Sequence, residues 1–251
     1  MSGHSHWSGI KHKKAIVDAK RGRLWSKLAR NIIVAARDGG GDPAMNLSLR
    51  YAIDKAKDAN MPKDTIEKAI KKGTGELGGA RYEEVVYEGY GVGGVAIMLE
   101  ALTDNRNRTA GELRHIFERR GGSLGATGCV GWMFAKKGQF VVDGAGTSEE
   151  QVMEVALEAG ADDVQGDGGS WEVTCASEAF EAVKSALEGA GLTVKEAELA
   201  QVPGNYVAVA DEAAAKRILA LMESLEEHED VQNVYANFDI PEDVLAKIEN
   251  E

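Results

Sequence analysis

Apolar residues in the first third of the chain recur at the three- and four-residue spacing of amphipathic helices. Leu24, Leu28 and Ile32 share one face of a helix predicted over residues 9–38, with a break near Gly22. A run of three glycines ends this helix at residues 39–41. A second helix is predicted over residues 44–59, and a third runs from Pro62 to Gly73. The inner face of the second helix is predicted to carry Met45, Leu49, Ala52, Ile53 and Ala56. Three short helices of this kind predict a small bundle.

After residue 80 the pattern changes to short runs rich in Val, Ile and Tyr, which predict strands alternating with helices. Strands are predicted at residues 84–88, 95–102, 139–142, 170–175, 192–199, 206–210 and 231–238. Helices are predicted at residues 109–120, 149–159, 177–189, 212–225 and 241–248. The first of these helices is expected to open with the capping box Thr109-Ala110-Gly111-Glu112.

The order of these elements predicts an α+β fold, with an N-terminal three-helix domain followed by two ferredoxin-like α/β domains, one inserted in the other. Residues 138–203 follow the β-α-β-β-α-β order by themselves. Residues 82–135 lack a second helix and a final strand, which residues 205–238 would supply. We therefore expect a basic helical domain at residues 1–79, a discontinuous middle domain at 80–137 plus 204–251, and an inserted domain at 138–203.

Charge is distributed very unevenly along the chain, whose formal net charge is -12. Residues 1–80 carry 16 Lys and Arg against 8 Asp and Glu, and residues 81–140 carry 8 against 7. Residues 141–251 carry 5 against 26. The total alone argues against a nucleic-acid partner, but this gradient predicts that the first part attracts polyanions and the last part repels them.

Basic residues near the N-terminus are the strongest functional signal, because binding to phosphates needs several cations with few competing acids. The nucleic-acid-binding residues predicted in this segment are His6, Trp7, Lys11, His12, Lys13, Lys14, Lys20, Arg21, Arg23 and Lys27. Trp7 is a candidate for stacking on a base, whereas Trp25 lies beside the apolar stripe and is expected in the core. The alternative is a solvated helix face, although such a face normally mixes both signs of charge.

A second basic cluster precedes and follows the start of the predicted helix at residue 109. Asn105, Arg106, Asn107 and Arg108 are predicted to face one anion together with the free N–H groups of a helix N-terminus. Arg114, Arg119 and Arg120 extend this cluster. The alternative is an ordinary loop followed by a helical pair between Arg114 and Glu118.

Motifs for catalysis are missing from the sequence. Two G-x-G-x-x-G runs begin at Gly73 and Gly89, but neither has the strand before it and the helix after it that dinucleotide binding requires. There is no P-loop, HExxH or GxSxG motif. If Met1 is removed, Ser2-Gly3-His4 has the spacing of a Cu(II) or Ni(II) chelate, but nothing else indicates a metal. We expect no catalytic residues, no cofactor and no metal.

Cysteine usage and hydropathy indicate a cytoplasmic protein with no membrane partner. Cys129 and Cys175 lie far apart without CxxC spacing, which is typical of a reducing compartment. Apolar stretches such as residues 92–102 are too short to cross a bilayer. The first residues lack the apolar core of a signal peptide, and the run from Gly3 to Trp7 is a poor fit to a transit peptide despite its basic surroundings.

Nine short runs, spread in order over almost the whole chain, together resemble the YebC/PmpR family. They are Gly3-His4-Ser5-His6-Trp7, Ile10-Lys11-His12-Lys13-Lys14, Asp18-Ala19, Ala59-Asn60-Met61-Pro62, Ala69-Ile70-Lys71-Lys72-Gly73, Tyr87-Glu88-Gly89-Tyr90, Thr103-Asp104-Asn105-Arg106-Asn107-Arg108-Thr109, Gly121-Gly122-Ser123-Leu124-Gly125 and Ala236-Asn237-Phe238. This family includes the mitochondrial translational activator of cytochrome c oxidase subunit I. The resemblance implies a cytoplasmic protein with a helical first domain and two α/β domains.

The resemblance is compatible with two functions in gene expression. Bacterial members are labelled DNA-binding transcriptional regulators, whereas the mitochondrial relative points to translation and the ribosome. We expect a non-enzymatic regulator that binds nucleic acid through its N-terminal segment and through residues 105–108. The alternatives are a ribosome-associated translation factor that binds ribosomal RNA, an enzyme with a site between the two α/β domains, and an interaction adaptor with a solvated basic tail. No evident helix-turn-helix reading element supports base-specific recognition of DNA.

Overall fold

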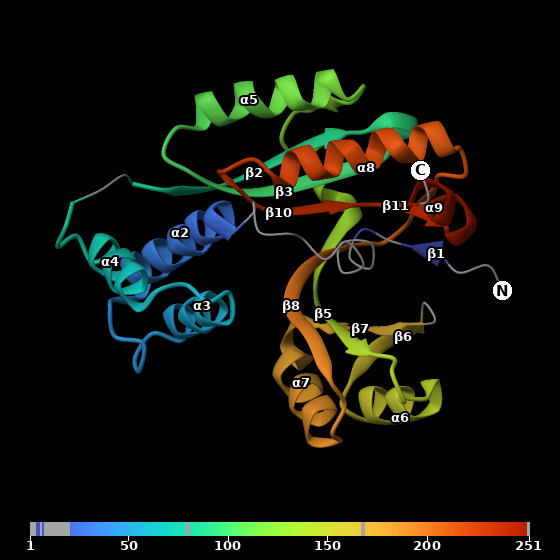
Figure 1. Cartoon of the computed structure of the whole chain (residues 1–251), viewed down its shortest axis with the longest axis horizontal. Coiled ribbons are helices and arrows are strands. Elements are labelled where there is room, and N and C mark those ends of the chain that lie inside the picture. Colours follow the sequence, from blue (N-terminus) through green and yellow to red (C-terminus); the bar gives the residue numbers. More distant parts are fainter. Residues whose placement is uncertain (1–3, 6, 8–20, 79–80, 167–168, 250–251) are drawn as a thin grey trace.

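The architecture confirms the predicted α+β class in a computed structural model that describes residues 4–5, 7, 21–78, 81–166 and 169–249. Figure 1 shows a bundle of helices, a sheet covered on one face by helices, and a second sheet with helices of its own. Within the described part of the chain, no helix combines the length and the apolar composition needed to cross a lipid bilayer.

The N-terminal helices are α2 (Arg21–Gly39), α3 (Leu47–Asp58) and α4 (Lys63–Gly73). Their apolar faces meet in a core of Leu28, Ile32, Ala36, Leu49, Ile53, Ala56, Met61, Ile66 and Ala69. Trp25 packs against this core and donates a hydrogen bond from Nε1 to the carbonyl of Ala59 at 3.0 Å. The core position expected for Trp25 is therefore confirmed, while the predicted helical residues before 21 lie outside the described part.

Helix α3 begins three residues later than the apolar pattern predicts. Asn46 has an extended backbone with φ of -120°, and its side chain accepts a hydrogen bond from the N–H of Leu49. An N-cap residue stops helical geometry from extending further toward the N-terminus. Met45 therefore precedes the helix and is 85% exposed, so its predicted place on the inner face is wrong.

The middle sheet has the strand order β10-β3-β2-β4 and pairs two distant parts of the chain. Its strands are β2 (Glu83–Tyr90), β3 (Ala96–Thr103), β4 (Ser123–Leu124) and β10 (Val231–Ala236). The 3-10 turn η2 (Val92–Gly94) joins β2 to β3 and places Gly93 at φ of 75°, a conformation that favours glycine. Helices α5 (Arg106–Arg119) and α8 (Glu212–Glu226) cover one face of this sheet (Figure 1) and enclose the largest core.

The second sheet has the ferredoxin-like order β6-β7-β5-β8, with antiparallel pairing throughout. Its strands are β5 (Phe134–Asp143), β6 (Ala161–Gly166), β7 (Ser170–Ala176) and β8 (Val194–Pro203). The 3-10 turn η3 (Gly131–Met133) precedes it, and η4 (Ser177–Ala179) precedes the second of its helices, which are α6 (Glu149–Glu158) and α7 (Phe180–Gly189). Phe134 pairs with Pro203, so the chain enters and leaves this sheet on neighbouring positions. This topology supports the proposed domain division, which we keep as a proposal.

A small third sheet, in the order β1-β11-β9, joins the start of the chain to its end. It contains β1 (His4–Ser5), β9 (Val207–Ala208) and β11 (Phe238–Pro241), and α9 (Glu242–Glu249) follows. The single strand predicted at residues 231–238 is split into β10 and β11. The cause is Asn237, whose buried side chain accepts a hydrogen bond from the N–H of Ala96 at 2.7 Å.

Candidate nucleic-acid interface

The predicted N-terminal binding residues divide into two groups. The first group lies outside the described residues and consists of His6, Lys11, His12, Lys13, Lys14 and Lys20. Arg21 is the first residue of α2, and Trp7, Arg23 and Lys27 are described with their contacts. The geometry of the interface therefore concerns the second group together with residues 105–108.

Trp7 is a core residue and not a stacking platform. Its side chain is 7% exposed and packs against Phe238, with ring centroids 6.3 Å apart and planes at 63°. Its Nε1 donates a hydrogen bond to Glu226 Oε1 at 3.2 Å. Pairing of β1 with β11 places Trp7 in the same core as α8. A side chain buried in this way cannot stack on a base, so this predicted role is contradicted.

The burial of Trp7 predicts that Trp7→Phe lowers stability without weakening nucleic-acid binding. Phenylalanine keeps a flat ring for stacking but loses the hydrogen bond to Glu226 and part of the packing. We expect the free energy of unfolding to fall by about 1–2 kcal/mol, measured by urea denaturation. Trp132→Phe is the matched control, since Trp132 is 75% exposed and its replacement is expected to cost less than about 0.5 kcal/mol. An equal effect of the two changes would contradict the core assignment.

The basic side chains of α2 contact acidic residues at the end of α8. Arg23 Nη1 lies 3.7 Å from Glu227 Oε2, and Lys27 Nζ donates a hydrogen bond to the carbonyl of Glu226. Arg30, one turn further along, contacts Glu229 and lies 3.1 Å from Asp230 Oδ1. The sequence predicts that the acidic C-terminal part repels polyanions, but it indicates no partner for this part within the chain. The structure shows that it also binds the basic face of α2.

Residues 105–108 form the start of α5 instead of the loop predicted from the sequence. Asn105 is the N-cap, and its side chain accepts a hydrogen bond from the N–H of Arg108. The predicted capping box at Thr109 is therefore wrong, because the helix begins three residues earlier. Arg108 binds Asp104 at 3.0 Å and Asp230 at 2.7 Å, while Arg106 lies 3.5 Å from Glu83. The anions that bind Arg108 are thus carboxylates of the same chain. Of residues 105–108, only Asn107 is exposed and has no side-chain partner among the described residues.

Asp230 is the point where three elements are held together. Its carboxylate is 2% exposed and accepts hydrogen bonds from Thr109 Oγ1 at 2.6 Å, Thr103 Oγ1 at 3.1 Å and Arg108 at 2.7 Å. Arg30 of α2 binds its second oxygen. Burial raises the pKa of Asp230, but the hydrogen bonds from Thr109 and Arg108 and the charges of both arginines outweigh it, so the pKa lies below its usual value. Nothing in the sequence around Asp230 sets this residue apart except its charge.

A second buried carboxylate, Glu88 on β2, fixes the loop that follows β4. It is 5% exposed, and it accepts hydrogen bonds from the backbone N–H groups of Gly128 at 2.7 Å and of Val130 and Gly131 at 2.6 Å. Burial raises the pKa of Glu88, whereas these three hydrogen bonds together bring it below its usual value. Glu88 therefore acts as a backbone anchor with its acceptor capacity used inside the protein.

Three possible metal donors come together at Glu112, His228 and Asp230. Each already has a partner in the chain: His228 Nδ1 accepts from the N–H of Asp230 at 3.1 Å, and its Nε2 lies 2.9 Å from Glu112 Oε2. A neutral imidazole that accepts at Nδ1 donates from Nε2. This cluster therefore works as a hydrogen-bonded link between α5 and the segment after α8.

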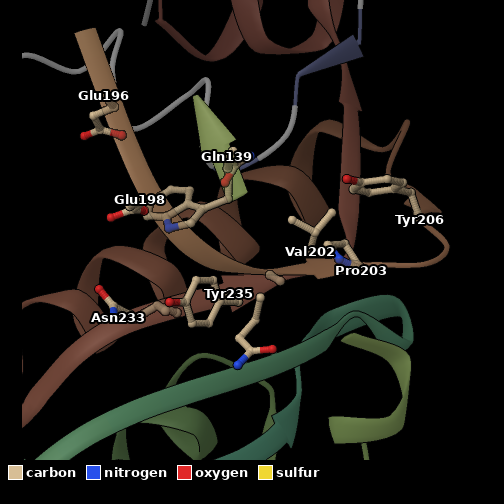
Figure 2. Close-up of a pocket in the computed structure, with 12 residues that line it drawn as sticks. Gln139, Glu196, Glu198, Val202, Pro203, Tyr206, Asn233 and Tyr235 are labelled. Atoms are coloured by element: carbon tan, nitrogen blue, oxygen red, sulfur yellow. The ribbon is translucent and has the colours of Figure 1, made fainter. Parts of the chain in front are cut away.

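A small cavity lies between the two α/β sheets, where the enzyme alternative would place its site. Figure 2 shows its lining, which includes Gln139, Glu198, Tyr206 and Tyr235. Its volume is about 60 Å³, well below that of typical ligand pockets. Burial and the charges of Glu172, Asp239 and Asp163 raise the pKa of Tyr206 to about 12, and burial and Glu100 also raise that of Tyr235. These shifts move both phenols away from the pKa range of acid–base catalysis near neutral pH.

Free cations lie on two other helices. Among the described residues, no hydrogen bond or ion pair engages the exposed side chains of Lys68, Lys71 and Lys72 on α4, of Arg114 and Arg119 on α5, or of Arg120 directly after α5. Lys71, Lys72 and Arg119 also stand in last turns, where they are favourable with the helix dipole. These side chains are therefore available to an external anion.

The class of this protein is defined by an α+β architecture in which a basic helical bundle lies beside two sheets with their own helices, and the sheet β6-β7-β5-β8 has the ferredoxin-like order. Comparison with known proteins then gives the family: residues 5–76 match the TACO1/YebC protein N-terminal domain, and residues 82–238 match the TACO1/YebC second and third domain. The chain belongs to the TACO1/YebC family, as its motifs indicated.

Relatives and a solved structure agree with this assignment over nearly full length. A protein of Pelotomaculum thermopropionicum is 57% identical over 96% of this chain and 99% of its own, and is named a probable transcriptional regulatory protein. A protein of Halothermothrix orenii with the same name is 54% identical over 100% of both chains. The crystal structure of a conserved hypothetical protein from Aquifex aeolicus superposes with a TM-score of 0.84 at 51% identity, covering 94% of this chain and 98% of that one.

Proposed function

We propose that this protein is a non-enzymatic regulator of gene expression that binds nucleic acid through its basic N-terminal part. The observation that carries the proposal is the charge balance of residues 1–80, which hold 16 basic against 8 acidic residues in a chain of net charge -12. The names of its relatives support a regulatory role. Free cysteines at positions 129 and 175 fit a place in the reducing cytoplasm.

The proposed contacts are mainly to phosphates. The cations that would neutralise a polyphosphate backbone are Lys11, Lys13, Lys14, Lys20, Arg21, Arg23 and Lys27. Further polar contacts would come from His6, His12, Asn105, Arg106 and Asn107. Arg108 is excluded from this set, because Asp104 and Asp230 hold it. Contacts of this kind position a protein on nucleic acid without reading its sequence.

A ribosome-associated translation factor is the second candidate, and the acidic remainder of the chain favours it. Residues 141–251 carry 5 basic against 26 acidic residues and would be repelled along an extended duplex. On a ribosome the same surface could face basic proteins while the N-terminal part contacts RNA. Sucrose-gradient sedimentation of lysate at low and high salt, followed by crosslink mapping, separates the two candidates. Comigration with ribosomes supports translation, and crosslinks confined to promoters support transcription.

Charge reversal of Lys11, Lys13 and Lys14 to Glu is expected to weaken nucleic-acid binding strongly. Each lost phosphate contact lowers the log–log slope of affinity against salt by about 0.7–0.9, so the slope should fall by about 2–3 in fluorescence anisotropy titrations. The matched control reverses Lys184, Lys195 and Lys247, which changes the net charge equally in the acidic part of the chain. If the first variant binds DNA, RNA and ribosomes as the unmodified protein does, the proposed function is wrong.

A further inference from the structure

The end of α8 concentrates negative charge where a helix tolerates it least. Glu226 and Glu227 are the last residue and the C-cap of α8, and Glu229 and Asp230 follow closely. We call Glu226, Glu227, Glu229 and Asp230 the acidic ridge. Carboxylates at a helix C-terminus are unfavourable with the helix dipole, and the last turn of α8 contains no basic residue. Cations from another part of the chain would therefore stabilise the ridge.

Helix α2 supplies these cations. Arg23 pairs with Glu227 at 3.7 Å, and Arg30 binds Glu229 and Asp230. Lys27 donates to the carbonyl of Glu226, one of the acceptors that the end of a helix leaves without an intrahelical partner. Docking of α2 on the ridge therefore offsets the unfavourable charge at the end of α8.

Elsewhere the helical bundle is attached loosely. Its apolar core draws only on residues between Trp25 and Ile70 among those described, so it does not merge with the core of the middle sheet. A cleft of about 730 Å³ separates the bundle from the open face of that sheet. The remaining ties include the hydrogen bond from Tyr51 to Glu181 at 3.0 Å and the ion pair of Lys55 with Glu198 at 3.7 Å. These two polar contacts lie at the surface, so salt weakens them and breaking them requires little free energy.

We infer that the basic face of α2, formed by Arg23, Lys27 and Arg30, has two alternative partners: the acidic ridge of the same chain and the phosphates of a bound nucleic acid. This inference rests on the proposed function. The ridge carboxylates occupy the positions that phosphates would take, so the docked chain restrains its own binding. Because linked equilibria are reciprocal, weakening the ridge must strengthen nucleic-acid binding, and nucleic acid must release α2.

The test replaces Glu227 and Glu229 by glutamine in the full-length protein. Asp230 is left unchanged because it also anchors α5. Affinity is measured by fluorescence anisotropy for a labelled single-stranded RNA and a DNA duplex, each of about 20 nucleotides. The matched control is Glu154→Gln with Glu158→Gln on α6, which removes the same charge from exposed positions on the inserted sheet's helix. We expect the ridge variant to bind about three- to tenfold more tightly than the control.

A second measurement follows the docking of α2 directly, by small-angle X-ray scattering of the same proteins. The unmodified protein is expected to expand on addition of RNA or of about 300 mM salt, and the ridge variant should be expanded already in dilute buffer. Equal affinities of ridge and control variants, or a radius of gyration that never changes, would overturn the inference. If no protein binds nucleic acid, the proposed function fails and the competition with it, while the scattering still reports whether the ridge holds α2.

Discussion

Asp230→Ala is expected to lower the free energy of unfolding by about 3–5 kcal/mol, because it removes one member of a buried charged network and leaves the others unpaired. Arg108, Arg30 and the hydroxyls of Thr103 and Thr109 all lose the carboxylate that they share. Urea denaturation followed by circular dichroism measures the change. Scattering should show at the same time that the helical bundle is no longer held against the middle sheet.

The stability that Asp230 contributes should depend on pH in a defined direction. Its pKa in the folded protein lies below the ordinary value of 3.8, so its contribution is fully present above that value and is lost as the pH falls through the folded pKa. The difference between the unmodified protein and Asp230→Ala should therefore shrink below about pH 4. Glu229→Gln is the control, since the Glu229 side chain is 72% exposed and such pairs contribute at most about 1 kcal/mol. Similar losses for both variants would contradict the role assigned to Asp230.

Glu88→Gln is expected to lower the free energy of unfolding by about 2–4 kcal/mol, although it changes only one atom type in the side chain. The carboxylate accepts from Gly128 with one oxygen and from Val130 and Gly131 with the other. An amide directs an N–H group at least at one of these donors, and a buried donor without an acceptor costs about 1–3 kcal/mol. Urea denaturation measures the global effect.

Hydrogen exchange localises the effect of Glu88→Gln. The amides of Gly128, Val130 and Gly131 should exchange faster in this variant than elsewhere in the middle sheet. Glu84→Gln, an exposed change on the same strand, is the matched control and should leave those amides protected. Unchanged exchange at the three amides would show that Glu88 does not hold the loop.

The fold could be predicted from the sequence because local signals agree with the tertiary structure. The apolar stripes of α2 and α4, the glycine turn at Gly93 and the alternation of β2 and β3 each specify an element by themselves. Errors arose where a side-chain hydrogen bond set a boundary: Asn46 caps α3, Asn105 caps α5, and Asn237 divides the last long strand. A polar strand such as β6 has too few alternating apolar residues for its bounds to be predicted from the sequence.

The candidate interface was less predictable, because a sequence shows where charges lie along the chain but not which of them meet in the folded protein. The sequence indicates that Arg23 and Lys27 are free cations. In the structure, Arg23 pairs with Glu227 and Lys27 donates a hydrogen bond to the carbonyl of Glu226, about two hundred residues away. The burial of Trp7 could not be predicted, because the short strand β1 before it has no recognisable pattern. The partner of β1 is β11, which lies at the other end of the chain. Long-range pairing of this kind leaves no periodic signal in a single sequence.

The neighbouring entry and exit of the inserted sheet also bear on how the chain folds. Strand β3 must pair with β10, which is synthesised only after β5 to β8, and such long-range pairing slows folding because the loop between the strands must close first. Because Phe134 and Pro203 are paired when β5 and β8 come together, completion of this sheet leaves only residues 104–133 and 204–230 as open loop. The open loop is then roughly halved, which lowers the entropic cost of closing it by about 0.6 kcal/mol. The sheet of β5 to β8 separates β3 from β10 in sequence, but once formed it thereby brings these two strands closer together.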